Sequence, residues 1–247
     1  MFVKFCEAKH NLAKNCLTIG LGTMQFFADD NPDFSRFDYS EGAFKVTNDG
    51  ASVHIDKGSM ERLTRGGIQG AGTYLAPGSN FIIQEQFPNC YIFCFSRDII
   101  PTIEVAKKID NSYDDWFEIH DLPKFVRRAA ELLMNQLKFS DLEVTENMTM
   151  EWFRGLNLSI VHRPCTYDGR ELIFNQETIP QALQATGDPL RWAFSKEAKH
   201  NEFNEYRILF VLQDSNGSIV PVKKGIKILN LLPELGVGTL QVDRGGQ

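Results

Sequence analysis

Hydrophobic and polar positions along the chain predict strands near both ends, with helical segments between them. Apolar residues dominate Phe2–Cys6, Cys90–Ser96 and Asn204–Leu212, and each run has the length of a strand. The run Cys90–Ser96 is apolar on both faces until its last residue, which is typical of a central strand. The end of the third run, Ile208–Leu212, is purely apolar, and we expect it to be buried.

The strongest helical pattern covers Leu122–Leu137. Its apolar residues recur at helical spacing, Asp121 precedes it as an N-cap, and Pro123 suits the first turn. Strands at both ends with helices inserted between them favour the α+β class with mainly antiparallel sheets. We expect a single domain over residues 1–235 and a flexible, glycine-rich tail over residues 236–247.

Composition narrows the class of protein. The chain has 247 residues, of which 43% are hydrophobic and 23% charged, so it can bury a substantial core. A net charge of −6 disfavours bulk binding to nucleic acid or to an anionic membrane surface. No apolar run approaches the length of about 18 residues that a membrane span needs. The N-terminus lacks the apolar region of a secretion signal, so we expect a cytoplasmic protein without membrane association.

Metal and phosphate sites are not predicted. The five cysteines lack the spacing of a zinc site and are expected to be buried, reduced thiols. The aspartate-rich segment from Asp29 to Asp38 lacks the glycine and the final glutamate of a calcium loop. The glycine-rich segment Arg65–Ser79 lacks the Gly-Lys-Ser/Thr ending of a P-loop, which favours a surface hairpin or lid over a nucleotide loop.

Charged residues stand at the start of the buried strand near the C-terminus. Glu205 and Arg207 are two residues apart, so on a strand they share a face. One interpretation is a surface salt bridge worth under about 1 kcal/mol. The other is a ligand site, because charges here lie where core meets surface. Ser96, at the end of another strong strand, either satisfies loop amides or supports that site.

Four short motifs occur in a suggestive order. They are Lys4-Phe5 on the first strand, Asp38-x-x-Glu41-Gly42, Cys94-Phe95-Ser96, and Glu205-Tyr206-Arg207 after Lys196. This order resembles a family of uncharacterised prokaryotic and phage proteins with a Lys-Tyr start, an Asp-x-x-Glu loop, a Cys-Phe-Ser strand and a Glu-x-Arg strand. Such proteins are discussed as distant relatives of the ADP-ribosyltransferases.

The resemblance implies a function. It implies that NAD is a substrate and that its ADP-ribosyl group passes to a macromolecule, in conflict between phage and host. Glu205 would orient the ribose and stabilise positive charge, and Ser96 would support that carboxylate. The implied nucleotide contacts are Lys4, Phe5, Asp38, Glu41 and Arg207. Lys4, Ser96 and Glu205 would then converge on one cleft.

Two departures keep other hypotheses open. Phe203 stands where arginine-directed transferases have a second glutamate, with Glu202 one position earlier, and Lys4 stands where those enzymes have Arg, His or Tyr. A non-enzymatic phage or host accessory protein that binds another protein is the alternative. A third hypothesis is a magnesium-dependent nuclease that uses Asp38 and Glu41, although both residues also suit turns.

Overall fold

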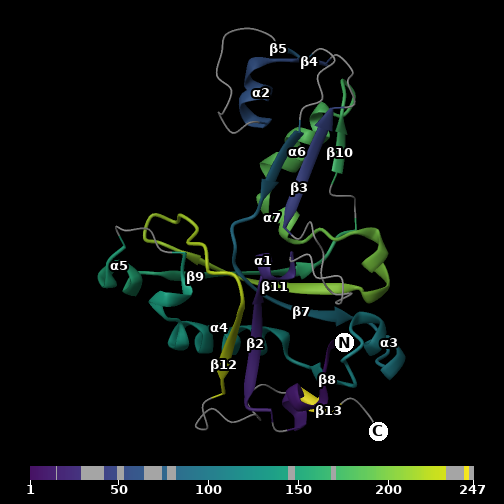
Figure 1. Cartoon of the computed structure of the whole chain (residues 1–247), viewed down its shortest axis with the longest axis vertical. Helices are drawn as coiled ribbons and strands as arrows, with labels where there is room; N and C mark the ends of the chain where they lie inside the picture. Colours follow the sequence, from purple (N-terminus) through teal and green to yellow (C-terminus); the bar gives the residue numbers. More distant parts are fainter. Residues whose placement is uncertain are drawn as a thin grey trace. The chain divides into compact units, whose positions relative to one another are not determined.

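The computed structural model divides the chain into two compact units, and each is built from segments that are distant in sequence (Figure 1). The first unit comprises Met1–Tyr39, Pro88–Cys165 and Lys199–Gln247, and the second comprises Ser40–Phe87 and Thr166–Ala198. The structure describes residues 1–14, 16–28, 42–48, 53–63, 74–76, 82–143, 148–167, 171–231 and 242–244. The predicted α+β class with mainly antiparallel sheets is confirmed.

An antiparallel sheet forms the first unit, with eight strands among the described residues. The strands are β1 (Phe2–Cys6), β2 (Thr18–Thr23), β7 (Tyr91–Arg97), β8 (Asp115–Ile119), β9 (Asn157–Pro164), β11 (Glu205–Gln213), β12 (Ile226–Asn230) and β13 (Val242–Arg244). Their order is β12-β2-β7-β1-β8-β13, and β11 lies between β7 and β9. The central position predicted for the strand after Cys90 is therefore confirmed.

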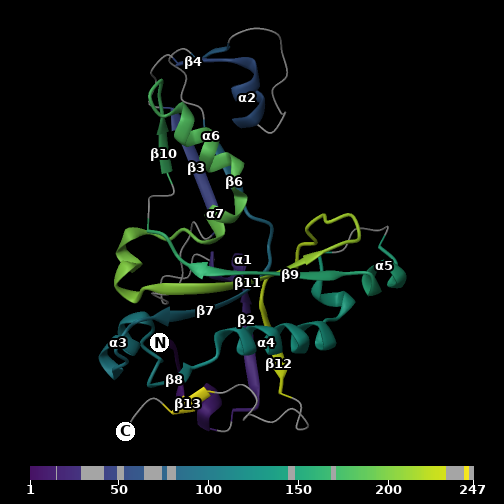
Figure 2. The same ribbon diagram turned by 180° about the vertical axis from the view of Figure 1, so that it is seen from behind.

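Short helices surround this sheet. They are α1 (Met24–Phe27), α3 (Ile103–Ile109), α4 (Leu122–Gln136) and α5 (Met150–Arg154), with 3₁₀ turns η1 (Ala8–His10), η2 (Leu12–Lys14), η3 (Phe139–Asp141) and η4 (Ala198–Phe203). The predicted N-cap of α4 is confirmed, because Asp121 Oδ1 accepts a hydrogen bond from the Lys124 amide at 2.9 Å. In both views α4 runs along one side of β9 and β11 (Figures 1 and 2).

The main core lies between α4 and one face of the sheet. Phe93 of β7 and Ile208 of β11 are buried there with Phe125 and Leu133 of α4. Burial of each such side chain contributes about 1.5–3 kcal/mol. Because side chains alternate along a strand, the residues next to Phe93 and Ile208 must point to the other face.

β7 is shared between three neighbours. One of its edges pairs with β11 from Tyr91 to Ser96. The other edge pairs with β2 at Tyr91 and Ile92, and with β1 at Ser96 and Arg97. Among the described strands, none pairs with the middle of β7 on that edge, so β1 and β2 diverge as a fork. The pair β2 and β12 runs in a different direction from β7 and β11 (Figure 1).

The second unit has its own small core. β3 (Ala43–Asn48) is parallel to β10 (Glu171–Phe174) and antiparallel to β6 (Ile82–Gln86), and β4 (Val53–Ile55) pairs with β5 (Tyr74–Ala76). The helices are α2 (Lys57–Leu63), α6 (Ile179–Gly187) and α7 (Pro189–Ala193). Val46, Phe174 and Trp192 are buried together. Except for β5, the predicted glycine-rich hairpin or lid lies outside the described residues.

Part of the predicted C-terminal tail is ordered into the sheet. Val242–Arg244 form β13, which pairs with β8, so these three residues depart from the expected flexible tail over 236–247. The boundary of a single domain at residue 235 stays a prediction. Within the described ranges, no helix combines the length and the apolar character needed to cross a membrane.

A buried carboxylate fastens the segment that connects β1 and β2. Asp115 Oδ2 accepts hydrogen bonds from Asn11 Nδ2 at 2.8 Å and from Lys14 Nζ at 2.7 Å. Burial alone would raise the pKa of Asp115, but the bonds from Lys14 and Asn11 outweigh it and hold the pKa below its usual 3.8. The ionised form therefore stabilises the fold above about pH 4, and this contribution is lost as the pH falls through the lowered pKa.

Replacing this carboxylate will cost stability at neutral pH. We expect Asp115→Asn to lower the free energy of unfolding by about 2 kcal/mol at pH 7, and the gap from the wild type to narrow below about pH 4. Urea unfolding at several pH values measures both effects. Asp121→Asn is the control, since an amide oxygen still caps α4 and the change stays under about 0.5 kcal/mol. A gap that does not vary with pH would contradict this account.

Candidate functional site

The strand register brings three predicted site residues to one face of the sheet. Glu205 of β11 lies opposite Ser96 of β7, and Arg207 lies opposite Cys94. Cα partners on paired strands project to the same face, so these four side chains face away from the α4 core. Ser96 is 5% exposed and Arg207 is 1% exposed, so both of these polar side chains are buried.

Glu205 and Arg207 form a buried ion pair. Arg207 Nε donates to Glu205 Oε1 at 2.5 Å, and 14% of the Glu205 side chain is exposed. The interpretation of this pair as a surface salt bridge is therefore wrong. β11 is an inner strand between β7 and β9, so its first residues are enclosed on both edges. A guanidinium buried to this degree requires a charged or hydrogen-bonding partner.

The adjoining ends of β7 and β11 are locked together beside this pair. The Arg97 amide donates to the Asn204 carbonyl at 3.0 Å, and Asn204 Nδ2 donates to the Arg97 carbonyl at 2.7 Å. Asn204 has φ +40° and Asp98 has φ +55°, left-handed conformations that Asn and Asp adopt more readily than most residues. The N-terminal ammonium of Met1 binds Asp98 at 3.1 Å. These contacts hold the start of β11, and therefore Glu205, in position beside the end of β7.

Lys4 does not join this group. Val3 is the β1 residue opposite Ser96, so the alternation of side chains directs Lys4 to the other face. Its Nζ donates to the Cys94 carbonyl at 2.8 Å, at the fork between β1 and β2. The expected convergence of Lys4 with Ser96 and Glu205 is therefore wrong, because a strand position one residue away reverses the face.

The other predicted contacts differ in status. Phe5 is 3% exposed and packs with Val3 and with Ala106 of α3, which makes it a core residue. Asp38 and Glu41 lie outside the described residues, so their contacts with a nucleotide stay predictions.

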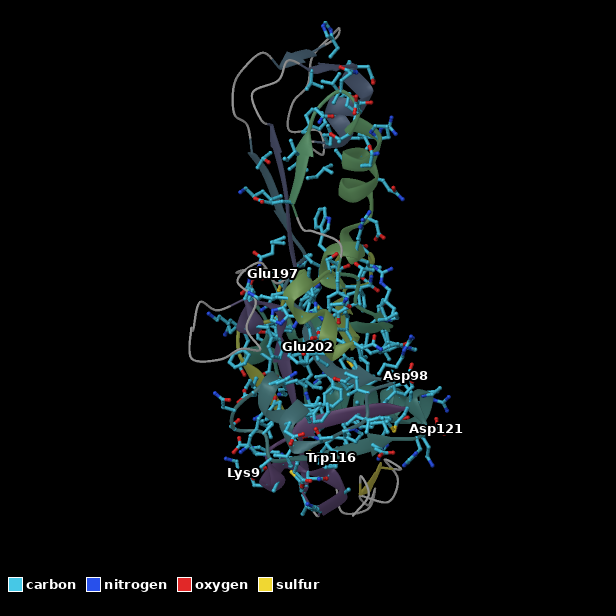
Figure 3. All side chains as sticks on the ribbon, turned by 90° about the vertical axis from the view of Figure 1, so that its right-hand side faces the viewer. Lys9, Asp98, Trp116, Asp121, Glu197 and Glu202 are labelled. Carbon is cyan, nitrogen blue, oxygen red and sulfur yellow. The ribbon has the colours of Figure 1, made fainter. Side chains whose placement is uncertain are left out.

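A second carboxylate is not supplied by the residues just before β11. Glu202, labelled in Figure 3, lies in η4. It is 53% exposed and binds Lys108 Nζ at 3.2 Å. Phe203 is also in η4 and not on the strand. Glu205 is therefore the only residue of this stretch that carries a carboxylate on β11.

Cys165 is a neighbour of Glu205 that the motif order did not reveal. Its Sγ lies 3.7 Å from Glu205 Oε1, and its amide donates to the Glu205 carbonyl at 2.8 Å. The pairing of Pro164 with Tyr206 produces this contact, because it places the next residue of the chain beside Glu205. Cys90 lies near Arg207. Burial raises the pKa of the Cys90 thiol and the charge of Arg207 lowers it, but the effect of burial is larger, so this thiol stays protonated at neutral pH.

Metal binding has no support in the part of the chain that is described. No group of three or more His, Cys, Asp or Glu side chains there could hold an ion. The nuclease hypothesis depends on Asp38 and Glu41 and therefore remains untested.

No protein-family model, curated protein or solved structure matches this chain. The resemblance to ADP-ribosyltransferase-like proteins therefore rests on the four sequence motifs and stays a prediction.

The ion pair predicts a contrast between two glutamates. Glu205→Gln removes the negative charge that Arg207 binds, and we expect the free energy of unfolding to fall by about 1.5–3 kcal/mol. Glu202→Gln, three residues earlier, alters an exposed pair and should cost less than about 1 kcal/mol. Urea unfolding of the two variants measures the difference. Equal losses would show that burial of Arg207 does not depend on Glu205.

Proposed function

We propose that the chain binds NAD at the adjoining ends of β7 and β11 and transfers its ADP-ribosyl group to a macromolecule. The observation that carries this proposal is the position of Glu205 directly opposite Ser96 on paired strands. The resemblance required a carboxylate and a serine on neighbouring strands, although the two residues are more than a hundred positions apart in sequence. The order of the four motifs supports the same proposal.

The chemistry suits a single fixed carboxylate. In the transfer, the bond between the ribose C1′ and the nicotinamide nitrogen breaks, and both electrons leave with nicotinamide, which becomes neutral. A nucleophilic atom of the target bonds to C1′ and releases a proton to solvent. Positive charge develops on the sugar before the new bond forms, and the Glu205 carboxylate stabilises it while accepting a hydrogen bond from the ribose.

Arg207 makes Glu205 suitable for this role. The bond from Arg207 Nε to Glu205 Oε1 holds the carboxylate in place, and 14% of the Glu205 side chain is exposed to an approaching ribose. A carboxylate that is already oriented does not have to reorganise in the transition state. Ser96 lies on the same face and supplies a hydroxyl beside the nucleotide.

The test is to measure NAD binding and nicotinamide release together. We expect heat on titration with NAD, slow release of nicotinamide, and at least about a 100-fold loss of release in Glu205→Gln with little change in NAD affinity. Glu202→Gln is the matched control and keeps the wild-type rate. Circular dichroism at the assay temperature verifies that Glu205→Gln is folded.

Two outcomes would contradict the proposal. One is the lack of heat together with an unchanged melting temperature at millimolar NAD. The other is nicotinamide release that folded Glu205→Gln retains in full.

A protein-binding function is the second candidate, and a groove beside α4 favours it. The groove has a volume of about 630 Å³ and lies between α4 and β9, where Val126, Ala130, Met134, Leu158 and Ile160 make much of its lining. Among the described strands, β9 pairs only with β11 and is therefore an edge. The lack of a second carboxylate on the strand among the described residues just before β11 agrees with this candidate. NAD binding without turnover in the wild type, or no NAD binding, would favour it.

A further inference from the structure

The fork between β1 and β2 encloses a cavity of about 380 Å³ in the first unit. This volume is in the range of small-molecule sites. Its walls are mainly apolar and aromatic, with Leu12, Ile19, Phe26, Phe27, Phe93 and Phe117 among them. Lys4 also lines the cavity, whereas Ser96 and Glu205 do not.

Two glycines of β2 line the cavity. Gly20 and Gly22 are paired with Ile228 and Ile226 of β12, and all four residues line the cavity. A Cβ on Gly22 would lie 2.4 Å from the ring of Phe27, so that ring lies directly on the Gly22 backbone. A Cβ on Gly20 would be 3.5 Å or more from its neighbours, which is ordinary contact. A Cβ at position 20 is therefore accommodated without displacing the strand, and we expect a valine there to reduce the volume of the cavity.

Lys4 brings a positive charge into this apolar space. Its Nζ binds the Cys94 carbonyl at 2.8 Å and lies 5.1 Å from the centre of the Phe93 ring. An ammonium group has three donors, and the bond to Cys94 uses one of them. Among the residues that the structure describes, no carboxylate lies within 4.0 Å of this ammonium.

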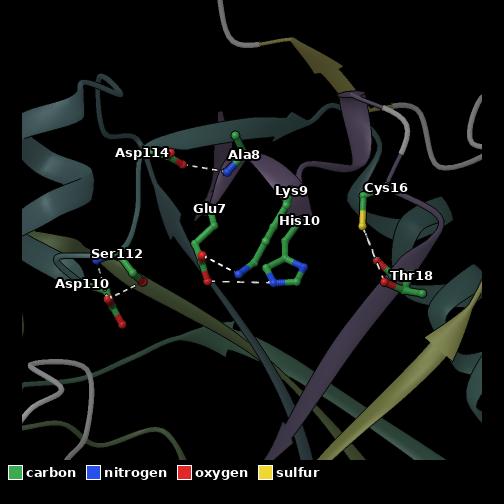
Figure 4. Close-up of polar contacts among 9 residues, drawn as sticks. All are labelled: Glu7, Ala8, Lys9, His10, Cys16, Thr18, Asp110, Ser112 and Asp114. Carbon is green, nitrogen blue, oxygen red and sulfur yellow. Dashed lines mark hydrogen bonds and ion pairs between the residues drawn. The ribbon is translucent and has the colours of Figure 1, made fainter.

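Glu7, which also lines the cavity, already has partners. Glu7 binds Lys9 at 2.8 Å, and its other oxygen lies 3.9 Å from His10 Nε2 (Figure 4). Asp114, the residue just before β8, accepts a hydrogen bond from the Ala8 amide at 2.7 Å (Figure 4). Of the two charged residues Lys4 and Glu7 that line the cavity, Lys4 is the one without a carboxylate or cationic partner among the described residues, and an anion would complement it.

We propose that this cavity binds a small molecule with a flat apolar body and one anionic group, such as an aromatic carboxylate or sulfonate. The anion pairs with the Lys4 ammonium and accepts hydrogen bonds from its other N–H groups. The flat body packs against Phe26, Phe27 and Phe93, whose rings favour stacked or edge-on contacts. This inference does not rest on the NAD-dependent function proposed above.

A pair of dyes tests both parts of the proposal. Anilinonaphthalene sulfonate and phenylnaphthylamine share one ring system, and only the first carries an anion. We expect fluorescence titration of the whole chain to show that the sulfonate binds at least about fivefold more tightly. Lys4→Met should remove that preference by weakening the sulfonate, with less than about a twofold change for the neutral dye. Lys4→Arg should retain the preference, which also controls for loss of the bond to Cys94.

Filling the cavity tests its location. Gly20→Val suits a strand and should weaken both dyes at least about tenfold while near-ultraviolet circular dichroism stays native. Gly187→Val is the matched control, because a Cβ on Gly187 meets nothing within 4 Å, and it should leave both affinities unchanged. Glu205→Gln should also leave them unchanged, which separates this site from the proposed NAD site.

Three results would overturn the inference. Unchanged dye binding in folded Gly20→Val would place the dyes elsewhere, for example in the groove beside α4. Equal affinities of the two dyes for the wild type would remove the role of the anion. A folded Lys4→Met variant that keeps the preference for the sulfonate would remove the role of Lys4.

Discussion

The antiparallel register between β7 and β11 is the constraint on which the rest of the first unit depends. Six consecutive Cα pairs, from Glu205–Ser96 to Phe210–Tyr91, decide which side chains meet α4 and which face away. A slip of one residue would exchange Ile208 and Arg207, and so place a guanidinium in an apolar core. The core and the candidate site are thus two faces of one pairing, and neither can change register alone.

The buried ion pair reflects this constraint. Arg207 cannot reach water from its position on an inner strand, and a buried charge costs several kcal/mol if it lacks a partner. Glu205 stands two residues earlier, which is the nearest position on the same face. An apolar pair would be at least as stable in such a place. That a polar pair occupies it is the physical reason to treat the adjoining ends of β7 and β11 as a site.

Sequence patterns were sufficient to predict the helices and strands but not which of them lie next to one another. The alternation and apolar runs predicted β1, β7, β11 and α4 to within two residues, because these signals are local. The depth of Arg207 could not be read from its own segment, since it depends on β9 pairing with β11 along the other edge. The contact of Cys165 with Glu205 follows from the same non-local pairing. The face of Lys4 was missed because it depends on the register of β1 against β7 and not on the composition of either strand.

The fork explains why Lys4 is where it is. A sheet that divides leaves backbone groups of the shared strand without a partner strand at the point of division, and buried groups of this kind need other partners. Lys4 donates a hydrogen bond to the Cys94 carbonyl at this division, so a side chain supplies a bond where no described strand pairs with β7. A leucine or isoleucine would fill the space but would lose this bond, which contributes about 0.5–1.5 kcal/mol. The need for a hydrogen-bond donor at the fork therefore places the Lys4 cation beside the aromatic cavity. The proposed anion site is thus a consequence of the division of the sheet between β1 and β2.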